Sequence, residues 1–366
     1  ACTPMAIGID AKGIAVDSMA FGSHANSSGE RAVAIGRTSV SSGDSAVAIG
    51  WSSLANASQA VAIGVDSKAS GIDSMAFGSH ANSSGEKAVA IGRASLANAS
   101  QSMAMGLQSQ ATGVDSMAFG SHANSSGEKA VAIGRASVSS GDSAAAIGWS
   151  SLANASRAMA IGVDSKSSGV DSMAFGSHAN SSGEKAVAIG RASLANATQA
   201  MAMGVQSKAS GVNAMAFGAN SNASNETTIA IGVNSLASGI NTMALGQGSK
   251  ATDYSAMAFG LGANSSGRYS IAIGQDTKAA IEHSIAMGYL ANAAEAFTIS
   301  QGAYSEATQR AAIALGYTAK ATDRDAMALG SFANASAKSA VALGPHAKGT
   351  AYKSIAIGAD SEAGTN

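Results

Sequence analysis

The chain has 366 residues, a formal net charge of −1 from 22 basic and 23 acidic residues, and only 4% aromatic residues. The balanced charge excludes the basic footprint of a nucleic-acid-binding protein, and no apolar run approaches the ~20 residues of a membrane helix, so we expect no nucleic acid partner and no membrane contact by this segment. Because the 46% hydrophobic content is supplied largely by alanine, the chain cannot fill a wide core, and any stable fold must have a thin interior.

A glycine recurs every fourteen residues along the whole chain. It stands at Gly8, Gly22 and Gly36 and continues without insertion or deletion to Gly358. We therefore predict a single solenoid over residues 1–366 with twenty-six coils. Residues 18–115 and 116–213 are nearly the same 98-residue block, which indicates growth by duplication. At ~4.8 Å per coil, the stack is expected to be a rod on the order of 120 Å long.

The first element of each coil is predicted to be a short strand. Met19-Ala20-Phe21 alternates large and small apolar residues, and a period of two indicates a strand. We expect the large residues to point into the coil and the small face to contact an identical parallel chain, because a long flat apolar strip is rarely left in water. Closed symmetry then favours a dimer or a trimer. The proposed interface residues are Ala20, Ala34, Ala62, Ala132, Ala160 and Ala258.

The second element follows the glycine and is also predicted to be a strand. Ala25 and Ser27 occupy places that are small in every coil, so they are expected inside, whereas His24 and Asn26 occupy freely variable places and are expected outside. Gly22 is needed at the bend between the strands, where φ is positive or the backbone is crowded, and a second frequent glycine such as Gly29 marks the other bend.

One coil breaks the pattern with Ile299-Ser300-Gln301, which puts an amide where the other coils have an apolar side chain. On the expected orientation Gln301 is buried, so it should find hydrogen bonds or water, or the coil should deform.

Aromatic residues gather after the glycines of four successive coils. We expect them to form one contiguous patch, which either binds a ligand or packs between neighbouring chains. The residues of this patch are Tyr289, Leu290, Tyr304, Tyr317 and Phe332.

The sequence shows no pattern typical of catalysis, metal binding or a cofactor. The equivalent histidines His24, His80, His122 and His178 lie ~14 to 19 Å apart along the predicted stack, too far to share one ion. No Ser-His-Asp grouping stands out, and the calcium-binding Gly-Gly-x-Gly-x-Asp run does not occur. Cys2 is the only cysteine, so no internal disulfide is expected. We predict a protein that is not an enzyme and has no cofactor or metal.

The coil motif resembles the YadA-like head of trimeric autotransporter adhesins. The run Ser/Ala-Val-Ala-Ile-Gly-x-x-Ser stands here at residues 32–39, 60–67 and 88–95. The resemblance covers essentially the whole chain. It implies an all-β, left-handed parallel β-roll, three parallel chains side by side, and display on a bacterial surface to bind extracellular matrix proteins, host cells or abiotic surfaces. We find no coiled-coil stalk, neck or membrane-anchor barrel, so we expect a head whose anchoring to the outer membrane is supplied by other segments.

Two other functions compete with adhesion. A structural fibre or surface-layer solenoid, in which the rod itself is the function, fits the same repeat. An ice-binding solenoid needs a regular outer array of threonine or similar groups, whereas the outer column here reads Lys12, Asn26, Val40, Leu54 and Lys68.

Overall fold

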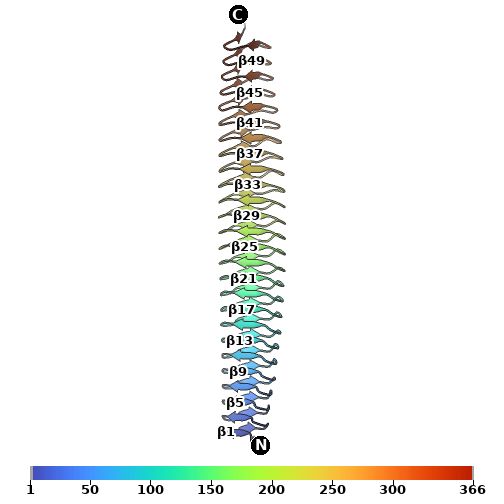
Figure 1. Cartoon of the computed structure of the whole chain (residues 1–366), viewed down its shortest axis with the longest axis vertical. Coiled ribbons are helices and arrows are strands. Elements are labelled where there is room, and N and C mark those ends of the chain that lie inside the picture. Colours follow the sequence, from blue (N-terminus) through green and yellow to red (C-terminus); the bar gives the residue numbers. More distant parts are fainter. Residues whose placement is uncertain (1–2, 365–366) are drawn as a thin grey trace. The chain divides into compact units, whose positions relative to one another are not determined.

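The computed structural model describes residues 3–364, so Cys2 lies outside the described residues. The chain divides into two compact units, residues 1–185 and 186–366. In both units the chain winds through stacked coils made of strands and turns (Figure 1). Within the described residues no helix is long and apolar enough to cross a membrane.

Each coil contributes two short strands to two separate parallel sheets. The odd-numbered strands have three residues: β1 is Met5–Ile7, β3 is Met19–Phe21, and each later one lies fourteen residues further on, to β51 at Ile355–Ile357. The even-numbered strands have two residues and follow the same spacing, from β2 at Lys12–Gly13 to β52 at Glu362–Ala363. Within each unit, equivalent residues pair in register, as Ala20 pairs with Ala34 and Ser27 with Ser41. The predicted strands and the fourteen-residue coil are therefore confirmed.

The core between the two sheets consists almost entirely of alanine and serine. Ser18, Ala20, Ala25 and Ser27 are all buried in one coil, and among residues 3–364 no fully buried side chain is larger than threonine. The thin interior and the inward places of the second strand are thus confirmed. Because the sheets are separated only by such small side chains, every large residue is excluded from the interior.

The predicted orientation of the first strand is wrong. Met19 is 39% exposed and Phe21 is partly exposed, whereas the alanine between them is completely buried inside its own coil. Alanines with no exposed surface cannot contact a second chain, which removes the whole proposed interface set: Ala20, Ala34, Ala62, Ala132, Ala160 and Ala258. The large apolar residues lie instead on the outer face of the odd-numbered strands.

Two sets of turns close each coil. We call the turns that follow the odd-numbered strands the first edge, and those that follow the even-numbered strands the second edge. On the first edge, Gly22 has φ of +134°, and a Cβ there would lie 2.6 Å from the carbonyl oxygen of Gly36. Both predicted reasons for this glycine therefore hold. Serines three residues later, such as Ser39, donate a side-chain hydrogen bond back to the glycine carbonyl at 2.9 Å.

Gln301 lies on the outer face of β43 (Ile299–Gln301) and is exposed, so the expected burial inside the coil is wrong. Its strand keeps the regular register, pairing with Met287 on one side and Leu315 on the other. The inward residue of the same strand is Ser300, whose hydroxyl lies 2.7 Å from that of Ser305. The Ser300 hydroxyl, which stands where other coils have an alanine methyl, therefore has a hydrogen-bond partner within its own coil.

Candidate interaction surfaces

The outer face of the odd-numbered strands is an apolar surface in both units. In the second unit it includes Ile229, Met243, Met257 and Ile271 on successive strands, and Met257 is 38% exposed. Because strands are stacked in register, these side chains form continuous columns. An apolar surface that repeats in this way is typical of a protein–protein interface.

The aromatic residues predicted to form a patch do lie in contact along the first edge. We call this set, together with the next residue of the same column, His346, the first ladder. The ring centroids of Tyr289 and Tyr304 are 5.2 Å apart, those of Tyr304 and Tyr317 are 6.0 Å apart, and those of Tyr317 and Phe332 are 5.3 Å apart. These three contacts are edge-to-face, whereas Phe332 stacks on His346 at 4.9 Å.

The rings of the first ladder are about half exposed and shield one another from water. Tyr317 is 50% exposed, and Leu290, beside Tyr289, is 40% exposed. Two effects raise the pKa of the Tyr304 hydroxyl above its ordinary value. The larger is desolvation by the surrounding atoms, and the second is the neighbouring Tyr289. The Tyr304 phenol therefore remains neutral at physiological pH and adds an uncharged ring to the ladder.

A second aromatic ladder, which the sequence analysis missed, lies on the second edge of the same unit. Tyr254, Tyr269, His283 and Phe297 are in contact, with ring centroids 5.5, 5.1 and 5.2 Å apart in that order. The Arg268 guanidinium lies over both tyrosines, 5.2 and 5.1 Å from their centroids. The signal that could have found it is the same as for the first ladder, namely aromatic residues in the two variable turn positions of successive coils.

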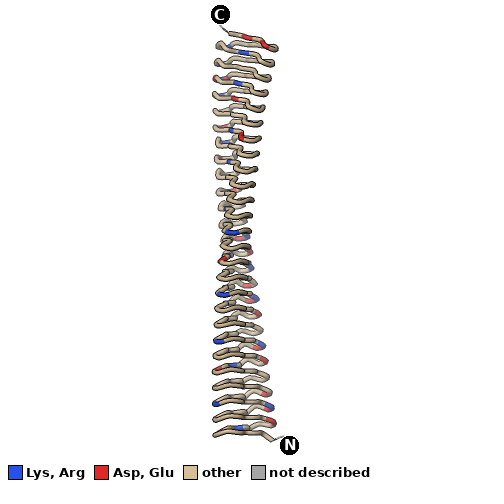
Figure 2. Tube along the Cα trace, turned by 90° about the vertical axis from the view of Figure 1, so that its left-hand side faces the viewer, with Lys and Arg blue, Asp and Glu red and all other residues tan. Residues whose placement is uncertain are grey.

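Arginine and lysine follow the second ladder along the second edge. Arg310 lies 5.6 Å from the Phe297 ring centroid, and the next two coils place Arg324 and Lys338 at the same turn position. Arg324 pairs with Asp325 at 3.5 Å, and within residues 3–364 Lys338 makes no ion pair. Elsewhere, both basic and acidic residues lie along the turns (Figure 2).

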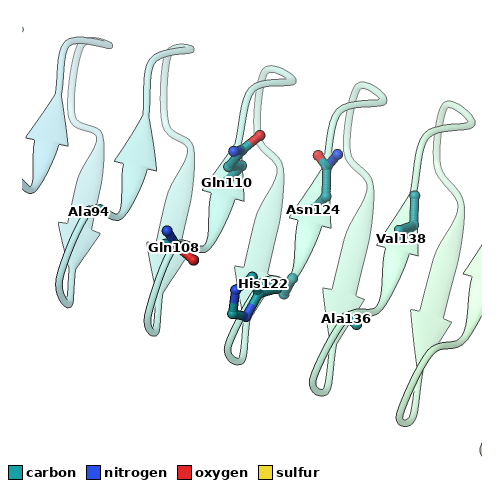
Figure 3. Close-up of a pocket in the computed structure, with 8 residues that line it drawn as sticks. Ala94, Gln108, Gln110, His122, Asn124, Ala136 and Val138 are labelled. Atoms are coloured by element: carbon teal, nitrogen blue, oxygen red, sulfur yellow. The ribbon is translucent and has the colours of Figure 1, made fainter.

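Shallow open grooves run between the first edge and the even-numbered strands. In the groove of Figure 3, Gln110, Asn124 and Val138 stand on successive strands, with Gln108 and His122 on the turns. Similar grooves pair histidine with an aspartate of the preceding coil, as His24 with Asp10 at 3.4 Å. The described part of the chain contains no group of three or more His, Cys, Asp or Glu that could hold a metal ion.

Comparison with protein families gives matches over most of the chain. The model described as "YadA head domain repeat (2 copies)" matches fifteen segments between residues 14 and 361, some of which overlap, including 14–39, 125–151 and 335–361. The chain belongs to the YadA head family. A comparison with curated proteins gave no match. Among solved structures, the collagen-binding domain of the Yersinia adhesin YadA matches at 29% identity, over 44% of this chain and 67% of that one, with a TM-score of 0.22.

Membership of the family explains why one motif occurs in every coil of this YadA-like head. The matched segments each span about two coils and include the apolar outer face, both edges and Tyr289, Tyr317 and Phe332 of the first ladder, whereas Tyr304 lies in the unmatched residues 292–306. The ladders are local additions to a shared coil, because only coils of the second unit carry them.

Proposed function

We propose that this YadA-like head is the non-enzymatic head of a bacterial surface adhesin that works as a parallel homotrimer of left-handed rolls. It is displayed outside the cell, anchored in the outer membrane by segments other than this one. It attaches the bacterium to an extracellular matrix protein, a host cell or an abiotic surface.

The observation that carries the assembly is the exposed apolar face of the odd-numbered strands. A core of alanine and serine buries little apolar surface per residue, so an isolated roll has a weak hydrophobic driving force. Packing three outer faces around a common axis removes Met257 and its equivalents from water and supplies that driving force. The large apolar residues thus take the interface role that the sequence analysis gave to the alanines.

The outer face of the even-numbered strands remains outside such a trimer and is available to a partner. This face is repeated from coil to coil and carries amide groups, as at Gln110 and Asn124. A repeated surface of this kind suits multivalent attachment to a large ligand, where many weak contacts add up.

Binding of the purified chain to immobilised matrix proteins tests this proposal. Light scattering first establishes the mass, which for a trimer is three times 35.5 kDa. The panel comprises fibronectin, laminin, bare plastic and collagen, the last because it is the ligand named for the Yersinia adhesin. Saturable binding to one surface, absent from an albumin-coated control and from heat-unfolded chain, is the expected result. A folded trimer that binds none of them contradicts adhesion, and end-to-end filaments in that sample would favour the structural-fibre alternative.

A further inference from the structure

We propose that the three chains lock in register through their edges, with the first edge of each chain docking on the second edge of its neighbour. This inference rests on the proposed trimer and adds to it the surface that fixes the axial position and the pairing of the chains. The first ladder therefore contacts a second copy of the chain and not an external ligand.

The geometry of a closed trimer brings the two edges together. When the outer faces of the odd-numbered strands turn toward one axis, the two edges of each flattened coil lie to its left and right. Rotation about an axis parallel to the stack keeps every residue at its own height. The first edge of one chain therefore meets the second edge of the next at the same coil, in three equivalent contacts.

The part of this contact nearer the N-terminus, in the coils of Gly248 and Gly262, places glycine opposite tyrosine. Gly248 and Gly262 occupy the second turn place of the first edge, with φ of +67° and +65°. All other described coils carry a side chain at this place with similar φ, such as Asn234 at +58°, so the backbone does not require glycine here. A Cβ on Gly248 would meet nothing within 4 Å in its own chain, whereas one on Gly262 would meet the side-chain carboxylate of Asp276. The second edge of the same two coils carries Tyr254 and Tyr269, which are the side chains that need such space.

The part of this contact nearer the C-terminus, in the coils of Tyr304, Tyr317 and Phe332, places aromatic rings opposite cations. The first edge carries Tyr304, Tyr317 and Phe332, and the second edge of the same coils carries Arg310, Arg324 and Lys338. Arginine and lysine bind well to aromatic rings, and arginine has two faces, so Arg310 can keep its contact with Phe297 while its other face covers a ring of the neighbour.

The two edges thus match in both size and chemistry over successive coils of one unit. Between the two parts, Asp276 on the first edge faces the coil of His283 on the second. A shift by three coils in one direction would place the tyrosines of one edge against those of the other, and the same shift in the opposite direction would leave the glycines beside alanine and arginine. Only the in-register alignment satisfies both parts, so the edges select parallel, unshifted chains.

Cysteine cross-linking tests the contact directly. In a Cys2→Ala background, Gly248→Cys and Ser255→Cys are introduced together; both lie in one coil but on opposite edges, so they cannot bond within a chain. Mild oxidation is expected to produce a covalent trimer on a denaturing gel, reversed by reductant. Each single variant is expected to remain free of covalent trimer, as is the shifted pair Gly248→Cys with Ser339→Cys.

Light scattering on the unoxidised double variant separates this inference from the proposed trimer. A trimer in solution that gives no covalent trimer on oxidation, or that cross-links equally through the shifted pair, overturns the edge contact. A monomer in solution for the Cys2→Ala parent overturns the proposed assembly itself and the edge contact with it.

A second experiment decides between a neighbouring chain and an external ligand as the occupant of the first ladder. The double variant Tyr304→Ser with Phe332→Ser is expected to lower the melting temperature of the trimer and to leave binding by the folded protein unchanged. Lost adhesion with unchanged melting would instead make the ladder a ligand site, and no change in either would leave the ladder without a role; both results overturn the inference.

Discussion

At the scale of single residues, the size limit of the interior dominates. Ala160 is fully buried between the two sheets, in register with Ala146 and Ala174. Ala160→Leu is therefore expected to destabilise the roll itself by about 1–3 kcal/mol, because added methylenes have no space to occupy. Thermal unfolding followed by circular dichroism measures this. Met159→Leu, a similar volume on the outer face of the same strand, is the control and should change stability little. Equal effects of the two would contradict the assigned faces.

Gln301 is the one polar residue among the third places of the odd-numbered strands, and it is expected to cost stability only in the proposed trimer. It is exposed in the single chain, but three copies would meet near the trimer axis between Met287 and Leu315. An amide buried without partners costs roughly 1–3 kcal/mol, so Gln301→Ile is expected to raise the melting temperature of the trimer. A clear decrease would show instead that the three glutamines bond to one another.

At the scale of the element, two glycines of the same edge should respond oppositely to substitution. Gly218 has φ of +128°, and a Cβ there would lie 2.6 Å from the carbonyl oxygen of Gly232, so Gly218→Ala should disrupt the coil. Gly248→Asn should leave the coil intact, since asparagine tolerates its φ and the space is open. It should nevertheless weaken the trimer. Circular dichroism and sedimentation measure the two effects, and a Gly248→Asn variant with wild-type trimer stability would count against the edge contact.

At the scale of the whole molecule, folding and assembly are expected to be coupled. Because the thin core stabilises one chain poorly, the melting temperature should rise with protein concentration, as mass action requires. Ile273→Asp, on the outer face of β39 (Ile271–Ile273), should dissociate the trimer, since three carboxylates would be brought together in an apolar interface. Lys278→Asp, on the outward side of the neighbouring β40 (Lys278–Ala279), is the control. A trimer that survives Ile273→Asp would place the interface elsewhere.

Much of the fold follows from the sequence because the repeat is local and exact in length. The fourteen-residue glycine spacing placed every strand, and the small residues at the places of Ala25 and Ser27 correctly indicated the interior. The contacts among Tyr289, Tyr304, Tyr317 and Phe332 were also predictable, because residues one coil apart are neighbours in a parallel stack.

Which face of the first strand is inside was decided only by the tertiary structure. The alternation of Met19, Ala20 and Phe21 shows that the two faces differ, but it does not say how far apart the sheets lie. Over the described residues the sheets approach closely enough to exclude every side chain larger than threonine from the interior, so alanine goes inside and the large residues remain on the outer face. The sequence placed Tyr254 and Tyr269 one coil apart but at different places in their turns, and only the tertiary structure decided that their rings meet edge-to-face, with centroids 5.5 Å apart.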